Sequence, residues 1–217
     1  MVESNGQSRG ADNTRNRILD ASLTLLNAEG IVKVSINRIA AEIDISPGNL
    51  YYHFKTKELI VDWLVRRLQN RVTAITNTTD AVIALDDFWV VVHLTLETLE
   101  EYRFVYRDLP HLVCNWPTIA QRVRTITTNL ITKTRGMCLD LARVSVIRVE
   151  PEELESVTLQ MVFTATCWTA FAGVLPRADA QTNQSGRTAY QVLTLLSPYL
   201  SKESHLYMKY LRSKYVK

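Results

Sequence analysis

The spacing of apolar residues constrains this chain more than any other feature of its sequence. Apolar side chains recur at intervals of three and four along almost its whole length, which is the period of a helix with one buried face. No stretch shows the strict alternation of a half-buried strand, and Gly and Pro number only seven and six in 217 residues. The sequence therefore predicts an all-α protein, long enough to bury a core without disulfides.

The same spacing, together with capping residues, places the helices and the main loops. Ser35, Ser46 and Thr56 each precede an apolar-periodic segment and can accept hydrogen bonds from the first backbone N–H groups of a helix. We expect loops at 149–151 and 177–186. The expected helices are 13–29, 36–44, 47–53, 57–77, 84–101, 103–114, 117–145, 151–174, 186–199 and 202–215.

Two short expected helices, 36–44 and 47–53, are separated by a tight turn. A third helix packed across such a pair completes a helix-turn-helix, which presents the end of its second helix to the major groove of DNA. Pro47 suits the first helical position, where its missing N–H costs nothing. The residues expected to form the small core of this unit are Ile39, Ala40, Ile45, Leu50 and Phe54.

The outward face of the helix at 47–53 offers groups suited to phosphates and base edges. A glycine allows close approach of the helix backbone to DNA, and an amide side chain can donate and accept at base edges. Asn49 and Tyr52 are the predicted base contacts, whereas Tyr51 could instead pack against the first helix. The predicted contacts on this face are Pro47, Gly48, Asn49, Tyr51, Tyr52 and His53, with Ser35 and Ser46 beside it.

Basic residues near this unit are the predicted phosphate contacts. The net charge of +3 is a weak argument for nucleic acid, so their positions carry the prediction. Lys55 and Lys57 follow the expected recognition helix, and Lys57 lies in the first turn of the next helix, where it opposes the helix dipole unless a phosphate docks there. Arg15 and Arg17 lie on the first helix, where they could also be solvated surface charges.

Residues 14 to 62 resemble the DNA-binding half of the TetR family. The resemblance rests on Ile18, Ala21, Gly30, Ser35, Ile39 and Ala40, and then on the run SPGNLYYHFKTKELI. This sequence departs from the family in having Asp44 where the turn usually has Gly, Ile43 where a small residue is usual, and Pro47 where a basic or polar residue is usual. Asp visits the left-handed region at modest cost, so we expect the turn to be kept.

The resemblance implies a helix-turn-helix DNA-binding domain at 1–58 and a helical domain at 59–217 that binds an effector and dimerises. It implies that the helices at 151–174 and 186–199 form a four-helix bundle with those of a second copy. It also implies an apolar effector cavity, although ordinary packing explains each candidate equally well. The candidate lining residues are Trp89, His93, Trp116, Met137, Phe163 and Trp168.

The predicted function is that of a ligand-responsive repressor that binds double-stranded operator DNA as a homodimer. One short recognition helix binds weakly, whereas two helices held one turn of DNA apart contact a palindrome together. An activator with the same architecture, or a DNA-binding adaptor without an effector, remains open. The segment EYRFVYRDLPHLV, residues 101–113, resembles one found in some of these regulators but names no ligand.

Enzymatic and membrane functions find no support in the sequence. It has no Gly-rich phosphate loop, no nucleophile elbow and no HExxH motif, so we expect no catalytic residue, cofactor or metal. A metal enzyme using His93, Glu97 and His111 is the weaker alternative. The polar N-terminus and the lack of a long apolar segment predict a cytoplasmic protein with no membrane contact, and Cys114, Cys138 and Cys167 are expected to be buried thiols.

Overall fold

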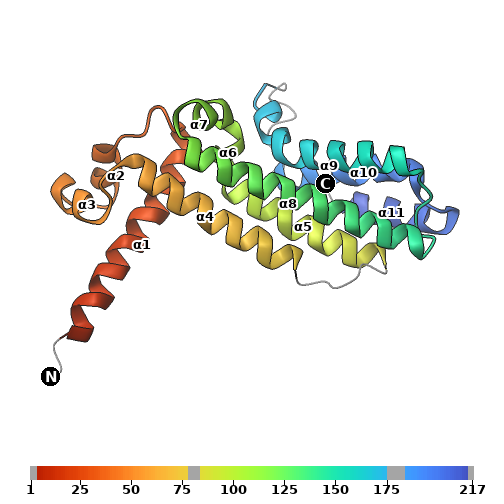
Figure 1. Cartoon of the computed structure of the whole chain (residues 1–217), viewed down its shortest axis with the longest axis horizontal. Coiled ribbons are helices and arrows are strands. Elements are labelled where there is room, and N and C mark those ends of the chain that lie inside the picture. Colours follow the sequence, from red (N-terminus) through yellow and green to blue (C-terminus); the bar gives the residue numbers. More distant parts are fainter. Residues whose placement is uncertain (1–3, 78–83, 175–183, 215–217) are drawn as a thin grey trace.

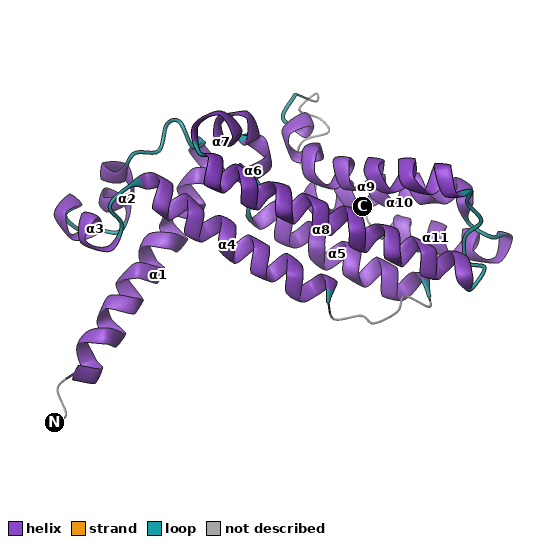
Figure 2. Ribbon diagram, viewed as in Figure 1, coloured by secondary structure: helices purple, strands orange, loops and turns teal. Residues whose placement is uncertain are grey.

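The computed structural model describes residues 4–77, 84–174 and 184–214. Its elements along these ranges are helices, which confirms the all-α prediction (Figures 1 and 2). In chain order they are α1 (Ser4–Glu29), α2 (Ile36–Glu42), α3 (Pro47–His53), α4 (Lys57–Thr76), α5 (Leu85–Glu101), α6 (Phe104–Arg107), α7 (Leu109–Asn115), α8 (Pro117–Arg143), α9 (Pro151–Ala172), α10 (Gln184–Leu196), the 3-10 turn η2 (Ser197–Tyr199) and α11 (Lys202–Ser213).

Helices α1, α2 and α3, residues 4–53, form a head at one end of the molecule (Figure 1). Gly30 ends α1 with a φ of 91°, a conformation that glycine adopts without steric cost. The α2–α3 pair closes on a small core in which Ile39, Ala40, Leu50 and Phe54 are buried. The predicted helix-turn-helix is therefore present, and of its five predicted core residues four are buried and Ile45 is partly buried.

Helix α4 joins the head to the rest of the chain, which we call the body (residues 57–214). Three residues separate it from α3, and Thr56 Oγ1 accepts a hydrogen bond from the backbone N–H of Leu59. It packs against α1 in the head and against α5 and α8 in the body. Ile60, Leu64 and Leu68 are among its fully buried side chains, so one continuous helix spans both parts.

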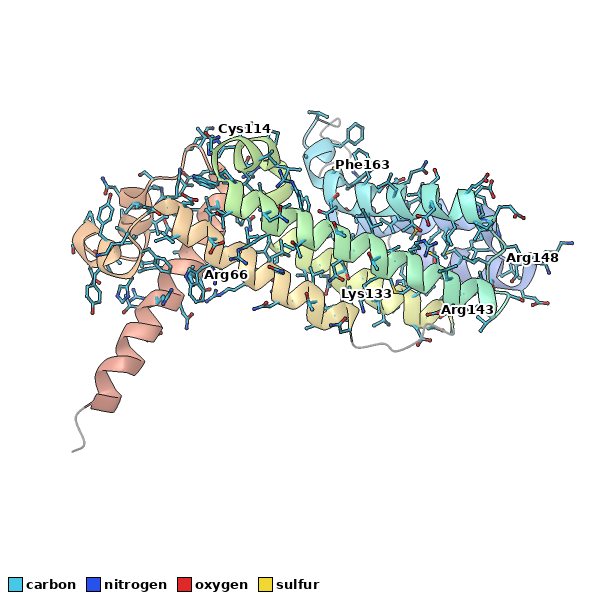
Figure 3. The ribbon with its side chains drawn as sticks, in the orientation of Figure 1. Arg66, Cys114, Lys133, Arg143, Arg148 and Phe163 are labelled. Atoms are coloured by element: carbon cyan, nitrogen blue, oxygen red, sulfur yellow. The ribbon has the colours of Figure 1, made fainter. Side chains whose placement is uncertain are left out.

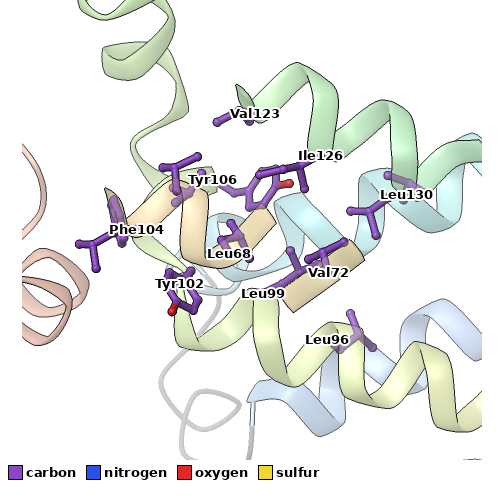
Figure 4. Close-up of a cluster of buried hydrophobic side chains, with 14 of the residues drawn as sticks. Leu68, Val72, Leu96, Leu99, Tyr102, Phe104, Tyr106, Val123, Ile126 and Leu130 are labelled. Carbon is purple, nitrogen blue, oxygen red and sulfur yellow. The ribbon is translucent and has the colours of Figure 1, made fainter. Parts of the chain in front are cut away.

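The body is a bundle of α4, α5, α8, α9 and α10, with the short helices α6 and α7 at its head end and α11 packed on α10. Its core is continuous with that of the head. Figure 4 shows part of this core, where Tyr106 of α6 lies among side chains of α4, α5 and α8 such as Leu68, Leu99 and Ile126. Along the described residues, none of the helices combines the length and apolar content needed to cross a membrane.

Several predicted boundaries differ from the observed ones. Helix α1 begins nine residues before the expected Asn13, and the expected helix at 103–114 is two helices that meet at Asp108. Pro198 lies in the 3-10 turn that follows α10, because its ring cannot continue an α-helix. The expected loop at 177–186 falls largely outside the described residues. Cys114 is exposed on α7, so the prediction of a buried thiol is wrong there.

Candidate DNA-binding site and its connection to the body

The outward face of α3 carries the predicted DNA contacts. Pro47, Gly48 and Asn49 are exposed at its first turn. Tyr51 is 44% exposed and Tyr52 is 76% exposed, although both are large aromatic residues. Tyr52 stacks edge-on against His53, with ring centroids 5.3 Å apart. The fold therefore places all six predicted residues of α3 on one helix whose inner side is anchored by buried Leu50.

Two predicted contacts, Ser35 and Ser46, act as helix N-caps. Ser35 Oγ accepts a hydrogen bond from the N–H of Arg38 at 3.1 Å, and Ser46 Oγ accepts one from the N–H of Asn49 at 3.1 Å. Both residues are exposed. Capping uses the hydroxyl as an acceptor, so the hydroxyl proton of each serine remains available to donate to a phosphate oxygen.

The turn between α2 and α3 keeps its shape without glycine. Asp44 has a φ of 55°, in the left-handed region where we expected an aspartate to replace the usual glycine. Arg17 supports the turn from α1, because its Nη2 donates to the carbonyl oxygen of Ile43 at 3.0 Å.

At Gly48, an added Cβ would meet only Ser46 Oγ, at 3.9 Å. Packing within the chain therefore does not demand glycine at this exposed position.

Arg15, also on α1, packs on aromatic rings. Its guanidinium carbon lies 4.1 Å from the centroid of the Trp63 ring and 5.1 Å from that of Phe54. Both distances fall within the range of cation–π attraction. Arg15 and Arg17 therefore tie α1 to the end of α3, to α4 and to the α2–α3 turn, in addition to any contact with DNA.

Lys55 and Lys57 have different surroundings. Lys55 is exposed in the short link between α3 and α4. Lys57 Nζ donates to the carbonyl oxygens of Ile31 at 2.7 Å and Val34 at 3.0 Å, and burial lowers the pKa of this ammonium. Two of its three N–H donors thus hold the α1–α2 connection, an arrangement the sequence did not reveal because these carbonyls lie 23 and 26 residues away.

A polar cluster fastens the end of α1 to the body. We call it the α1 clamp and define it as Asn27, Arg107 and Asp108. Arg107 donates from Nη2 to the carbonyl oxygen of Leu26 at 2.6 Å and from Nη1 to that of Asn27 at 2.7 Å. Asp108 accepts a hydrogen bond from the N–H of Ile31 at 2.9 Å.

Asn27 completes the α1 clamp from the other side. Its Nδ2 donates to the carbonyl oxygen of Glu101 at 2.7 Å, and its Oδ1 accepts from the N–H of Phe104 at 3.1 Å. Arg107 and Asp108 belong to the segment 101–113 that the sequence singled out without assigning a role. Arg107 binds two carbonyls at the end of α1: that of Leu26, which also accepts from the N–H of Gly30, and that of Asn27. The last carbonyls of a helix need such partners, because the helix itself does not supply them all.

A second charged cluster links α4 to α8 near the head. Asp62 is buried on α4 and accepts hydrogen bonds from Arg122 Nε of α8 at 2.6 Å and from Arg66 Nε at 2.9 Å. Arg66 lies on α4 close to where α4 passes α1 (Figure 3). Pairing with two guanidinium groups offsets the cost of burying the carboxylate. The apolar pattern of α4 gave no sign of it.

The six candidate effector contacts do not share one cavity. Trp89 and His93 stack on α5, with ring centroids 5.4 Å apart, and Lys214 Nζ lies 5.1 Å from the Trp89 ring. Trp116 packs edge-on with His111 between α7 and α8. Phe163 and Trp168 lie on α9, along a groove that opens at the surface. Helical spacing predicts which side of its own helix each residue occupies, but not which other helix that side contacts. The sequence alone therefore could not separate these residues into different sites.

Met137 alone among the six lines a small apolar cavity between the end of α4 and helices α5, α8, α9 and α10. This cavity encloses about 40 Å³, well below the roughly 300 Å³ of a small ligand pocket. Met161 faces it as well, and methionine side chains rearrange readily. Its lining residues are Thr76, Val91, Val92, Thr95, Leu96, Leu130, Thr134, Met137, Met161, Val162, Ala165 and Val192.

Helices α9 and α10 leave an apolar face uncovered. Phe163, labelled in Figure 3, is 64% exposed, and Leu159 and Phe171 on the same helix are also exposed. A groove of about 320 Å³ runs along this face, with Gln191 and Leu195 of α10 on its other side. These are the two helices for which the sequence predicted a four-helix bundle with a second copy.

The weaker alternative of a metal site was built on His93, Glu97 and His111. His93 Nε2 lies 3.3 Å from Glu97 Oε1, because the two residues are one helical turn apart on α5. His111 instead contacts Trp116 and Asn115 on α7. Within residues 4–77, 84–174 and 184–214, no three His, Cys, Asp or Glu side chains come together as a ligand set.

Two protein-family models match the chain. The model for "Bacterial regulatory proteins, tetR family" matches residues 18–62, and the TetR model for "Bacterial transcriptional repressor" matches residues 66–207. An HTH-type transcriptional regulator of Staphylococcus aureus strain bovine RF122 is 30% identical over 105 residues, 48% of this chain and 56% of that protein. One from strain USA300 is 37% identical over 59 residues, 27% of this chain and 32% of its own length. The matches thus span about half and a third of these curated relatives.

Solved structures match over nearly the whole chain. A TetR-family regulator from Marinobacter aquaeolei VT8 has a TM-score of 0.83 and 32% identity, covering 93% of this chain and 98% of that one. CprB from Streptomyces coelicolor, solved in complex with its operator, has a TM-score of 0.69 at 18% identity, covering 94% and 96%, and shares the fold. This chain belongs to the TetR family of transcriptional regulators, which bind DNA through a helix-turn-helix.

Proposed function

We propose that this regulator is a ligand-responsive repressor that binds a palindromic operator as a homodimer. The observation that carries the proposal is the outward face of α3, where Asn49, Tyr51 and Tyr52 stand exposed on a helix fixed from beneath by Leu50 and Phe54. A rigid helix with amide and phenol groups at its exposed end suits direct contact with base edges in the major groove. Pro47, Gly48 and His53 border these contacts.

The phosphate contacts in this proposal come from the residues around α3. The hydroxyl protons of Ser35 and Ser46, the ammonium of Lys55 and the guanidinium groups of Arg15 and Arg17 flank the recognition helix. Lys57 has one N–H donor beyond its two bonds to the α1–α2 connection. These contacts would fix the register of the head on DNA without reading sequence.

The second copy in the dimer would cover the apolar face of α9 and α10. Exposed Phe163, Leu159 and Phe171 are costly to leave in water, and a contiguous apolar patch of this kind is typical of an interface. A dimer carries two heads, and once the first head is bound to DNA the second binds within the same complex. The affinity of the dimer for DNA is therefore much higher than that of one head. The boundary between DNA-binding and effector domains falls within α4, near residue 58.

The effector in this proposal is a small apolar molecule that enters between α5, α8, α9 and α10. The cavity there is lined by apolar groups and three threonines, and about 40 Å³ is too little for such a molecule. Binding must therefore enlarge it, through movement of Met137 and Met161. A ligand that binds only the enlarged cavity increases the population of that state. If the two heads are arranged differently in that state, the affinity of the dimer for DNA changes as well.

The first test is selection of bound fragments from random and genomic DNA by the purified protein. We expect an inverted repeat with half-sites about one turn of DNA apart. Asn49→Ala should relax preference at one position of each half-site, because the amide contact to a base edge is lost. Failure to enrich any inverted repeat, or an unchanged preference in Asn49→Ala, would contradict the proposal.

The sign of regulation and the effector are tested separately. A repressor lowers transcription from a promoter that contains the selected site, and its deletion raises it; the reverse result would make the protein an activator. For the effector, apolar compounds are screened for a rise in melting temperature and release of operator DNA. Met137→Trp should fill the cavity and abolish that response, whereas a retained response would place the effector elsewhere.

A further inference from the structure

A cleft of about 380 Å³ opens between α10 and α11, in the half of the molecule remote from α3 (Figure 1). It is separate from the small apolar cavity and from the groove on α9, with which it shares no lining residue. On α11 the lining residues follow one helical face, at intervals of four, three and one. The lining residues are Tyr190, Ser197, His205, Lys209, Arg212 and Ser213.

The chemistry of this lining is one-sided. It supplies an ammonium, a guanidinium, an imidazole, a phenol and two aliphatic hydroxyls, and no carboxylate is among these lining residues. Elsewhere on the described surface, several arginines have acidic partners, as Arg143 has Asp140 and Arg135 has Glu155. A cleft lined by cations and hydroxyls concentrates anions, because several donors converge and no negative charge opposes them.

Arg212 is held in place within the cleft. Its Nη2 donates to the phenol oxygen of Tyr190 at 2.7 Å, and its guanidinium carbon lies 4.5 Å from the centroid of the Tyr190 ring. Its Nε is buried and has no hydrogen-bond partner among the residues that the structure describes. The guanidinium carries five N–H donors, and the bond to Tyr190 uses only one of those on its two terminal nitrogens.

Tyr190 gains a role from the same contact. Its oxygen accepts the hydrogen bond from Arg212, so its own phenol proton remains available to an acceptor in the cleft. The ring also fixes the plane of the guanidinium, which lowers the entropy lost when a ligand binds. Lys209 and His205 lie one and two turns earlier on α11 and add donors from the same face.

We propose that this cleft binds a small phosphate-bearing molecule. A phosphate group offers oxygens in several directions, which suits donors that approach from both α10 and α11, and guanidinium–phosphate hydrogen bonds are short and strong. The cleft is larger than a phosphate group alone, so the ligand carries further atoms beside its phosphate. DNA is not the occupant, because the cleft lies away from the recognition helix (Figure 1).

The test is calorimetric titration of the full chain with inorganic pyrophosphate, in a buffer without phosphate. We expect one saturable site, weakened about tenfold or more in Arg212→Gln and in Lys209→Met, because each change removes a charged donor. Lys202→Met removes the same charge from the same helix outside the cleft, so its affinity should stay within about twofold of the wild type. No binding by the wild type, or equal losses in Lys202→Met and Lys209→Met, would overturn the proposal.

Two further comparisons keep the result specific. Tyr190→Phe retains the ring but removes its hydroxyl group, and should weaken pyrophosphate binding several-fold. This variant keeps the proposal testable if Arg212→Gln fails to fold. Malonate replaces phosphate by carboxylates, and binding as tight as that of pyrophosphate would overturn the assignment to phosphate. In the absence of pyrophosphate, Lys209→Met should bind operator DNA as tightly as the wild type. A failure of pyrophosphate binding would therefore contradict this proposal without bearing on the proposed function.

Discussion

Arg107 caps the C-terminal end of α1 from another helix, with its Nη2 2.6 Å from the carbonyl oxygen of Leu26, 81 residues away in sequence. The end of a helix leaves carbonyl groups without intrahelical partners, and a cation near them also complements the helix dipole. Asp108, the next residue, holds the N–H of Ile31 just beyond that end. The position of the head on the body therefore depends on a pair of side chains from α6 and the residue that follows it.

Replacing Arg107 should loosen this attachment. Arg107→Met removes the hydrogen bonds to the carbonyl oxygens of Leu26 and Asn27 and the ion pair with Asp108, although Leu26 keeps its bond from Gly30 and Asp108 keeps its bond from Ile31. We expect the free energy of unfolding to fall by about 2 to 3 kcal/mol. Arg103→Met is the matched control, because Arg103 pairs only loosely with Glu100 at 3.5 Å near the surface; its effect should stay below about 1 kcal/mol. Urea unfolding measures both, and equal effects would rule out the clamp as a support.

Lys55 and Lys57 should separate DNA contact from stability. Lys57→Met removes two hydrogen bonds to the α1–α2 connection, so we expect a loss of about 1 to 3 kcal/mol in the free energy of unfolding. Lys55→Met should leave stability nearly unchanged but reduce the slope of log affinity for DNA against log salt by about one. Urea unfolding and salt-dependent operator binding are the measurements. A stable Lys57→Met protein with a flatter salt slope would instead make Lys57 mainly a phosphate contact.

A charge on the apolar face of α9 should prevent dimerisation. Phe163→Asp places a carboxylate where the proposed partner would pack, and we expect a monomer in sedimentation velocity and a loss of operator affinity of about a hundredfold or more. The control is Leu206→Asp, which alters an α11 residue that is 77% exposed and lies outside the α9–α10 face. A Phe163→Asp protein that remains dimeric would move the interface to another surface.

Stability should decline at alkaline pH. Burial raises the pKa of the Tyr106 phenol from 10.0 to about 12 and that of the Cys138 thiol from 9.0 to about 12. Between the ordinary and the raised pKa the native state keeps a proton that the unfolded chain releases. The free energy of unfolding therefore falls as pH rises, by up to about 1.4 kcal/mol per pH unit for each group. The lowered pKa of Lys57 acts in the opposite direction within its own window.

Urea unfolding from about pH 8 to about pH 11 measures this decline. Tyr106→Phe should remove part of the slope above pH 10.0, where the phenol of the unfolded chain ionises, and Cys138→Ala should remove part of it above pH 9.0. An unchanged slope in both variants would mean that other groups control alkaline unfolding.

The sequence predicted what depends on neighbouring residues. Ser35, Ser46 and Thr56 cap their helices as expected, and Asp44 occupies the left-handed turn position, because caps and turns involve residues within about four positions of one another. The buried side of the head followed from periodicity in the same way. These local rules were enough to fix the helix-turn-helix.

Contacts between distant segments could not be predicted in this way. Periodicity tells which side of a helix is buried but not which helix covers it, so Trp89 and Trp116 were grouped although they lie in different parts of the body. Polar contacts such as Asp62 with Arg122, 60 residues apart, leave no periodic trace at all. The six effector candidates therefore come from several separate places in the body, and the α1 clamp was missed for the same reason.

The continuity of α4 makes it a stiff lever. Its 20 residues span about 30 Å, with the apolar cavity near one end, at Thr76, and the head at the other. A tilt of about 5° about the cavity end moves the head by roughly 2.5 Å over that length. In a twofold dimer both heads move, so their separation changes by up to about 5 Å against a half-site spacing of about 34 Å. A ligand no larger than a few carbon atoms is thus enough to spoil the match to DNA through this small tilt, without unfolding either domain.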